Sequence, residues 1–287
     1  MNLVFITILM LLPSFASAQN SAAIAKFDND SLALKGFEFS NDGSLLVEVL
    51  PTAVLKTTQM RQNDGVSVRR AKDLPAFDSW TRREMVLING GLSGISSDRP
   101  DGLLVSDGNA AALANRQKLR GQPDSDCALR QQDRLRLAGL LCVAQDGRLS
   151  IGKFDPDKVS SGTSAQDKAG GCRHALQSGP LLVEDGRAAV CRRKPDEPAE
   201  NRSAVCIVGD KVWLVVTTKP AQLDDLAMWL AGEPNKPRCQ WALALGGGDA
   251  AGAVYTPRNV HQAGKKSTYF GLGALPVASF IVVRGRP

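Results

Sequence analysis

Six Asp-Gly dipeptides punctuate this chain, and they constrain its fold more than any other feature of the sequence. They occur at positions 42–43, 64–65, 101–102, 107–108, 146–147 and 185–186, and several of them lie between apolar or alternating runs. Asp-Gly favours the tight turn whose twist matches that of two paired strands, so it is a strong local signal for a β-hairpin. The sequence therefore predicts a β-rich chain in which antiparallel pairing is common.

Three hairpins and one further strand can be placed from the apolar runs beside these and similar turns. We predict pairing of residues 140–143 with 149–151, of 181–183 with 188–190, of 205–208 with 212–216 around Gly209-Asp210, and a strand over Leu103–Val105 before the turn at 107–108. Each run is short and rich in Val, Leu or Ile, as is typical of strands. Local pairing of this kind does not fix the order of strands in a sheet.

Helix is predicted in only two places. Over Ala221–Ala231, apolar residues recur at the spacing of one helix face and Gly232 follows as a stop signal. A second helix is predicted over Asn109–Leu119. The chain shows no internal repeat and no break in composition. We therefore predict an α+β fold: a single sheet-rich domain with mostly antiparallel or mixed β-sheet, many hairpins and few helices.

The first 18 residues are typical of a secretory signal peptide. Residues 2–13 are nearly all apolar, and the small-x-small pattern Ala16-Ser17-Ala18 follows. The run is shorter than the roughly 20 apolar residues that a membrane-spanning helix needs. We expect cleavage after Ala18, a mature chain that begins at Gln19, and a secreted or periplasmic location without a transmembrane segment. An ordinary hydrophobic N-terminal helix is the alternative.

Six cysteines follow the expected cleavage site, an even number that is typical of disulfides in an exported protein. Two pairs flank charged stretches: Cys127 with Cys142, and Cys191 with Cys206. Bridging either pair would close a loop of about 15 residues, worth about 3 kcal/mol. Cys172 and Cys239 would then pair by elimination, but other connectivities and buried free thiols stay open. No Cys-x-x-Cys pair is present and the chain has only two histidines, so a zinc site is not expected. The sequence assigns no residue to any other metal or to a cofactor, and a metal requirement stays open.

The net charge of +6 favours anionic partners, such as phosphorylated glycans or membrane surfaces. The basic residues occur as scattered doublets rather than along one helix, and aromatic residues make up only 5% of the chain. Nucleic-acid binding depends on a clustered basic surface, often with aromatic stacking platforms. The composition therefore argues against a nucleic-acid partner.

Four short segments place a polar or glycine-rich turn beside an apolar, strand-like run. They contain Asn89-Gly90-Gly91, Gln177-Ser178-Gly179-Pro180, Asn201-Arg202-Ser203-Ala204-Val205 and Leu245-Gly246-Gly247-Gly248. Backbone amides are exposed at such junctions, and glycine lets a ligand approach them closely. The side chains of Gln177, Ser178 and Arg202 add donors suited to a phosphate or a sugar hydroxyl. A plain hairpin turn at Asn89-Gly90 and a surface role for Arg202 are the alternatives.

Together these segments resemble the phosphodiester glycosidase family, and residues 275–283 resemble the closing strand of that family. The resemblance covers residues 80–287, while residues 19–79 match nothing in it and are interpreted as an N-terminal elaboration. It implies a hydrolase that acts on a sugar-1-phosphodiester or a phosphorylated glycan. The expected substrate-binding residues are Asn89, Gly90, Gly91, Gln177, Ser178, Gly179, Arg202, Gly247 and Gly248.

The chain departs from this family at its glycine loop. Family members have Leu-Asp-Gly-Gly, whereas this chain has Gly246 in place of the aspartate and Asp249 three residues later. Cleavage of a glycosyl phosphate needs a carboxylate that activates water or stabilises positive charge on the sugar. Asp249 is therefore the candidate catalytic carboxylate. His174 is a second candidate acid or base, with a merely solvated loop histidine as the alternative.

Two functions from different classes therefore stay open. The first is an exported hydrolase that resembles phosphodiester glycosidases. The second is a catalytically silent module that binds glycan or phosphate on the same scaffold, and the loss of the aspartate favours it. An envelope assembly factor without a small-molecule site is a third hypothesis. If the resemblance holds, Asn89, Ser178, Arg202 and the loop 246–249 should meet at one pocket.

Overall fold

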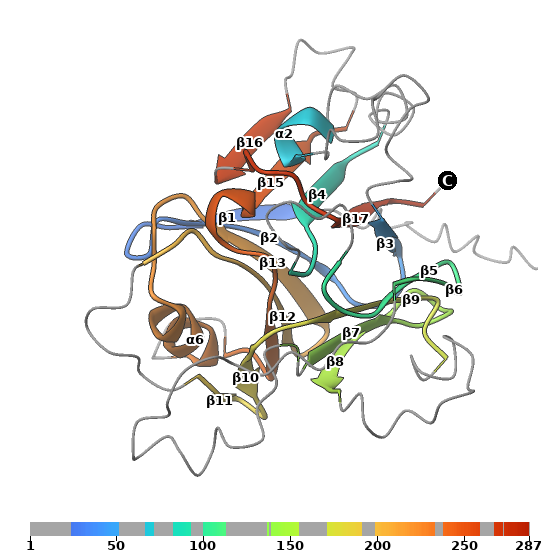
Figure 1. Ribbon diagram of the computed structural model, residues 1–287, viewed down its shortest axis with the longest axis horizontal. Helices are drawn as coiled ribbons and strands as arrows, with labels where there is room; N and C mark the ends of the chain where they lie inside the picture. Colours follow the sequence, from blue (N-terminus) through green and yellow to red (C-terminus); the bar gives the residue numbers. More distant parts are fainter. Residues whose placement is uncertain are drawn as a thin grey trace, which may run out of the picture.

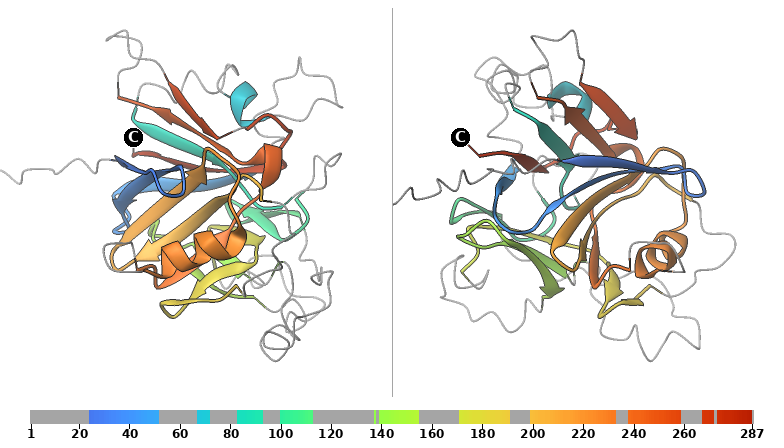
Figure 2. Two further views of the ribbon diagram at one scale, coloured as in Figure 1. Left: turned by 90° about the vertical axis from the view of Figure 1, so that its left-hand side faces the viewer. Right: turned by 180° about the vertical axis from the view of Figure 1, so that it is seen from behind.

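The computed structural model describes residues 24–51, 67–71, 83–92, 100–112, 137, 139–154, 171–190, 199–232, 238–258, 267–271 and 273–286. Three antiparallel sheets make up most of this part of the chain, as Figures 1 and 2 show. The prediction of a sheet-rich fold with mostly antiparallel pairing and few helices is confirmed. The predicted signal peptide and the turn at 64–65 lie outside the described residues.

The first sheet has seven strands, and it takes its strands from both ends of the chain. Its order is β1 (Ala25–Asn29), β2 (Leu34–Ser40), β13 (Lys211–Thr217), β12 (Ser203–Val208), β14 (Trp241–Ala244), β10 (Leu181–Glu184) and β11 (Arg187–Ala188). Helix α6 (Leu223–Ala231) packs against its outer face (Figure 1). The observed helix therefore confirms the one predicted over Ala221–Ala231.

The other two sheets have five strands each. The second sheet has the order β16 (Thr268–Gly271), β15 (Gly252–Thr256), β4 (Met85–Asn89), β17 (Ser279–Gly285) and β3 (Leu45–Pro51). The third has the order β6 (Asn109–Ala112), β5 (Leu104–Ser106), β9 (His174–Ser178), β7 (Gly139–Val143) and β8 (Leu149–Lys153). Two short elements complete the described part: α2 (Val68–Ala71) and the 3-10 turn η2 (Gly248–Ala250).

One hydrophobic core is shared by all three sheets. Successive strand residues point to opposite faces of a sheet, so one face of each sheet can turn inward. Val205 of β12, Ile88 of β4 and Leu176 of β9 all belong to this common core. Their neighbours Ala204 and Leu87 point the other way, Ala204 toward α6 and Leu87 into a separate cluster with Val68 of α2. The sheets therefore surround one interior instead of forming separate units.

The N-terminal strands are part of this core. Strand β2 pairs with β13 along its whole length, and β3 pairs with β17 along its whole length. Phe37 and Val47 are almost completely buried. Residues 19–79, which we expected as an elaboration, thus supply strands to the same interior as residues 80–287. The domain boundaries themselves stay a prediction.

The three predicted hairpins are observed at β7–β8, β10–β11 and β12–β13, and the strand predicted before the turn at 107–108 is observed as β5. The helix predicted over Asn109–Leu119 was wrong in its described part, because Asn109–Ala112 forms strand β6, which pairs with β5. The turn at Asp107-Gly108 has both residues at positive φ, which folds the chain back so that Val105 pairs with Ala110. The helix propensity of the alanines does not prevent this pairing. Residues 113–119 lie outside the described part.

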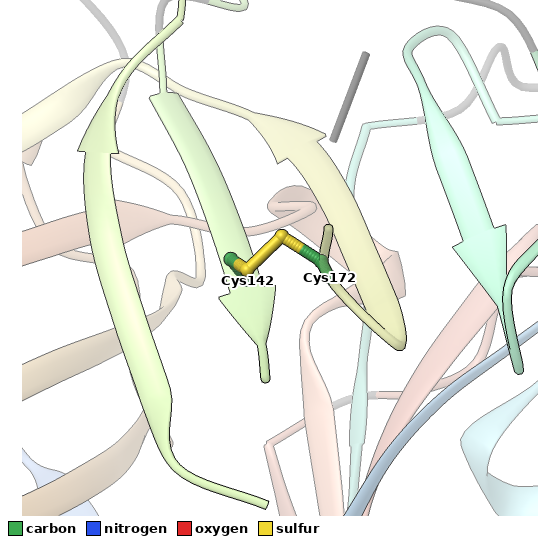
Figure 3. The surroundings of a disulfide bond; sticks show 2 residues. All are labelled: Cys142 and Cys172. Carbon is green, nitrogen blue, oxygen red and sulfur yellow. A yellow bond between two sulfur atoms is a disulfide. The ribbon is translucent and has the colours of Figure 1, made fainter. Parts of the chain in front are cut away.

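The disulfides differ from the pairing that we expected. Cys142 is bonded to Cys172 and Cys206 to Cys239. The reason is sheet topology: β7 pairs with β9, which places Cys142 beside the residue that leads into β9 (Figure 3). In the same way β12 pairs with β14, which begins just after Cys239. Cys127 and Cys191, the partners that we predicted for Cys142 and Cys206, lie outside the described residues.

No helix in the described part of the chain is long and apolar enough to cross a membrane. The two disulfides are compatible with an oxidising compartment.

The disulfide arrangement predicts the thiol content of the mature protein. The two observed disulfides use four of the six cysteines, so at most Cys127 and Cys191 can carry thiols. We expect no more than two titratable thiols in protein denatured without reductant, and six after reduction. Four or more thiols before reduction would contradict the two observed bonds.

Candidate functional site

The ends of four strands meet at the glycine loop, which we define as residues 245–249. This loop leaves β14 next to the start of β12, because Leu245 N–H donates to the Ser203 carbonyl at 2.9 Å. The end of β4 reaches the same loop, where Gly246 N–H donates to the Gly90 carbonyl at 2.8 Å. Beside β14, Ala244 N–H donates to the Pro180 carbonyl just beyond β9. The four segments singled out in the sequence therefore converge.

Asn89 holds this loop with its side chain. The residue is completely buried, and its Nδ2 donates to the Gly246 carbonyl at 2.7 Å. A longer bond from Nδ2 reaches the Gly90 carbonyl at 3.3 Å, and Oδ1 accepts from Gly252 N–H at 3.1 Å. The amide thus joins the end of β4, the loop and the start of β15. The sequence led us to expect that Asn89 faces a substrate, whereas here it faces backbone.

Two buried serines also donate hydrogen bonds to backbone carbonyls at the glycine loop or beside it. Ser178 is buried, and its hydroxyl donates to the Ala244 carbonyl at 2.7 Å. Ser203 is buried too, and its hydroxyl donates to the Gly246 carbonyl at 2.7 Å. Gly246 therefore accepts from both Asn89 and Ser203. These buried hydrogen bonds connect β12 of the first sheet to the loop, and β9 of the third sheet to the end of β14 beside the loop.

Gln177 stabilises the neighbouring chain, not the loop. Its Oε1 accepts from Leu103 N–H at 2.9 Å, and its Nε2 donates to the Leu137 carbonyl at 2.9 Å. The side chain is 1% exposed. Its amide is therefore committed to two backbone partners. Gly90 is committed as well, because its N–H donates to the Ser279 carbonyl at 2.8 Å.

Position 246 has little room for a side chain. A Cβ added to Gly246 would lie 3.1 Å from Nδ2 of Asn89 and 3.2 Å from the carbonyl oxygen of Gly91. Both distances are shorter than ordinary van der Waals contact. An aspartate at position 246 would also bring its negative charge close to the carbonyls of Gly90 and Gly91. The glycine thus fits the close approach of the β4 end to the loop.

Arg202 lies on the other side of the loop. A Cβ added to Gly247 would be 3.5 Å from its Nη1, so the guanidinium and this glycine are neighbours. The side chain is 14% exposed, and its Nε donates to the Ala221 carbonyl at 3.3 Å. Its backbone N–H donates to Oγ1 of Thr217 at 2.8 Å. Gly247 makes no backbone hydrogen bond to any residue that the structure describes.

Glu200 is the carboxylate in contact with Arg202, and our sequence reasoning did not single it out. Its Oε2 lies 3.1 Å from Nη1 of Arg202 and 3.8 Å from the position of a Cβ on Gly247. The side chain is about half exposed, at 49%. Residues i and i+2 of an extended segment share one face, so the spacing to Arg202 was the signal that could have identified it.

Asp249 occupies the exposed end of the loop. It lies in η2, and its backbone carbonyl accepts from Ala274 at 2.8 Å and Leu275 at 3.2 Å. The side chain is exposed and makes no hydrogen bond or ion pair with the described residues. Gly248 N–H donates to the Asn201 carbonyl at 2.9 Å. The structure thus places Asp249 in the loop without contact to Arg202.

His174 lies away from the glycine loop, at the opposite end of β9 from Ser178. It begins β9 while Ser178 ends that strand, four residues or about 13 Å away. The ring is buried, and its Nδ1 accepts from Asp107 N–H at 3.1 Å. Burial lowers the pKa of His174, Arg173 acts in the same direction, and the carboxylates of Glu48 and Asp107 oppose them. A catalytic role for His174 gains no support from this location.

Within the described residues, no group of three or more His, Cys, Asp or Glu side chains could hold a metal ion. The groups that the described structure brings together beside the glycine loop are the guanidinium of Arg202, the carboxylate of Glu200 and the backbone of Gly247. A guanidinium is suited to bidentate contact with a phosphodiester, and backbone amides beside glycine bind anions as well.

The role of Asn89 predicts a large loss of stability on its removal. In Asn89→Leu the buried N–H of Gly252 loses its acceptor, and the Gly246 carbonyl loses one of two donors. We expect the free energy of unfolding to fall by about 2–4 kcal/mol. The matched control is Asn109→Leu, because exposed Asn109 also donates to a backbone carbonyl. Chemical denaturation should show a change below about 0.5 kcal/mol for that control, and equal effects would contradict a special role for Asn89.

The environment of His174 predicts a pH dependence of stability. Its pKa in the folded protein is below the usual 6.5, so the unfolded chain takes up the proton first as the pH falls. The stabilisation is complete above about pH 6.5 and is lost as the pH falls through the lowered pKa. Between pH 8 and 5 we expect wild type to lose more unfolding free energy than His174→Gln. Parallel curves would show that His174 is not held neutral.

Comparisons with known proteins were made on the whole chain. The model of the phosphodiester glycosidase family matches residues 82–284. A solved structure of the catalytic domain of zebrafish N-acetylglucosamine-1-phosphodiester alpha-N-acetylglucosaminidase, described as auto-inhibited by its pro-peptide, is similar with a TM-score of 0.52 and 16% identity. The similarity covers 93% of this chain and 82% of that one.

A second solved structure, a hypothetical protein from Synechocystis, has a TM-score of 0.50 and 13% identity, covering 92% of this chain and 62% of that one. No curated protein matched the chain. At these identities the two structures support the fold alone. The family match extends over well more than half of the 287 residues, and this chain therefore belongs to the phosphodiester glycosidase family.

Proposed function

We propose that this protein is an exported hydrolase that cleaves sugar-1-phosphodiesters, either as small molecules or in a phosphorylated glycan. Membership of the phosphodiester glycosidase family supports the reaction class. The single observation that carries the proposal is that Arg202 lies beside the glycine loop. Its Nη1 is 3.5 Å from the position that a Cβ on Gly247 would occupy. An arginine beside a glycine-rich turn is a suitable site for a phosphodiester.

The substrate would bind with its phosphate against Arg202 and the backbone amide of Gly247. Ser178, Gly90 and Asn89 act in this proposal by fixing the loop or the strand end beside it, because their polar groups are committed to backbone partners. Gln177 fixes the neighbouring chain at Leu103 and Leu137. Catalysis further requires a carboxylate, and Asp249 and Glu200 are the two that the described structure brings to the loop or to Arg202. The net charge of +6 and the two disulfides fit an exported protein with an anionic ligand.

A catalytically silent module that binds glycan or phosphate is the alternative. The specific observation that favours it is the crowding at position 246, where the family has an aspartate and where a Cβ in this chain would lie 3.1 Å from Nδ2 of Asn89. Such a module would keep Arg202 and Gly247 for the phosphate while lacking turnover. Binding and turnover must therefore be measured separately.

The proposal predicts that Arg202 contributes to ligand binding. The probe is the methyl phosphodiester of N-acetylglucosamine-1-phosphate, because the zebrafish relative is named for an N-acetylglucosamine-1-phosphodiester. We expect Arg202→Ala to weaken its binding by about 10- to 150-fold, as for loss of a charged hydrogen bond of about 1.5–3 kcal/mol. Isothermal titration calorimetry gives the dissociation constants. The corresponding diester of glucose-1-phosphate tests whether the protein distinguishes between the two sugars.

The matched control is Arg148→Ala. Arg148 pairs with Asp146 two residues away, as Arg202 does with Glu200, but lies in the turn between β7 and β8. Binding by this control should equal that of wild type. If wild type binds neither diester, or if both variants bind as wild type does, the proposed site is wrong. Binding by wild type with no release of reducing sugar would favour the silent module.

A further inference from the structure

We propose that Glu200 is the catalytic base of this protein and supplies the carboxylate that the glycine loop lacks at position 246. This inference rests on the proposed function, because it assigns a residue to that same reaction. It differs from the sequence-based expectation, which gave this role to Asp249. The carboxylate must lie beside the bound phosphodiester, and the place of the phosphodiester is set by Arg202.

The position of Glu200 meets this requirement. Its Oε2 is 3.1 Å from Nη1 of Arg202 and 3.8 Å from the position of a Cβ on Gly247, so it lies beside both the guanidinium and the loop. A guanidinium carries five N–H donors, which allows one arginine to contact a carboxylate and a phosphodiester together. Asp249 has no such contact among the described residues, and its side chain is exposed.

The backbone of Glu200 is fixed while its carboxylate stays accessible. Glu200 forms an isolated β-bridge with Ala221, in which Ala221 N–H donates to the Glu200 carbonyl at 2.8 Å and Glu200 N–H donates back at 3.3 Å. The side chain is 49% exposed, so water reaches it. Water screens the attraction between this half-exposed carboxylate and Arg202, so shifting Glu200 during a reaction costs little.

The chemistry needs only one base. Glu200 accepts a proton from water as the water oxygen forms a bond to the anomeric carbon of the sugar. The bond between that carbon and the phosphate oxygen breaks, and its electron pair leaves with the phosphate. The products are the free sugar and a phosphomonoester, which finally takes the proton from Glu200. A phosphomonoester is a stable anion, so it can leave without a proton from a second side chain.

The test compares Glu200→Gln with two carboxylate controls on the methyl phosphodiester of N-acetylglucosamine-1-phosphate. We expect Glu200→Gln to lower kcat by at least about 10²-fold, the loss typical of an acid-base group. Its dissociation constant for the diester should stay within about threefold of wild type. Asp146→Asn, which removes an exposed carboxylate also paired to an arginine two residues away, should keep full turnover. Asp249→Asn is the second comparison, because the sequence favoured Asp249 as the catalytic carboxylate.

A second measurement separates a base from a structural residue. In Glu200→Ala, added sodium formate should restore part of the turnover, because a small carboxylate can occupy the vacated space. Turnover by Glu200→Gln equal to wild type, or the large loss in Asp249→Asn instead, overturns the inference while leaving the proposed function intact. Binding without turnover in wild type overturns the role of Glu200 and favours the silent module. Neither binding nor turnover in wild type contradicts the proposed function as well.

Discussion

The carbonyl of Gly246 is the point on which this site depends. It accepts a hydrogen bond from Asn89 on the second sheet and another from Ser203 on the first, both at 2.7 Å. Next to it, Ser178 at the end of the third sheet donates to the Ala244 carbonyl. A buried polar group without a partner costs about 1–3 kcal/mol. The loop is therefore held where three sheets meet, by groups that each have a partner only in this arrangement.

This arrangement divides the polar residues of the family segments into two sets. Asn89, Gln177 and Ser178 are buried and bonded to backbone, so Asn89 and Ser178 position the loop and the strand end beside it, while Gln177 positions the neighbouring chain. Arg202 and Glu200 lie at the loop with partly exposed side chains, and they carry the charge that can meet a ligand. Strands from distant parts of the chain are needed to bring the two sets together, which explains why the segments are spread over more than 150 residues of sequence.

Local pattern was enough to predict much of the fold. The hairpin at Gly209-Asp210 and the helix that ends before Gly232 depend on neighbours in sequence, and both are observed. Strand β6 was missed because its alanines favour helix, while the turn at Asp107-Gly108 decides their pairing. The disulfides of Cys142 and Cys206 depend on which strands are neighbours in a sheet, and loop length carries no such information.

The same limit applies to the site. The sequence predicted that the four segments would converge, and the hydrogen bonds at Gly246 and Ala244 show that they do. It did not indicate which side chains face backbone and which face solvent, since that depends on partners from other sheets. A crystal structure with N-acetylglucosamine-1-phosphate bound tests the division most directly. We predict phosphate oxygens within hydrogen-bond distance of the Arg202 guanidinium and the Gly247 amide, with Asn89 still bonded to Gly246. A phosphate bound to Asn89 or Ser178 and away from Arg202 would contradict it.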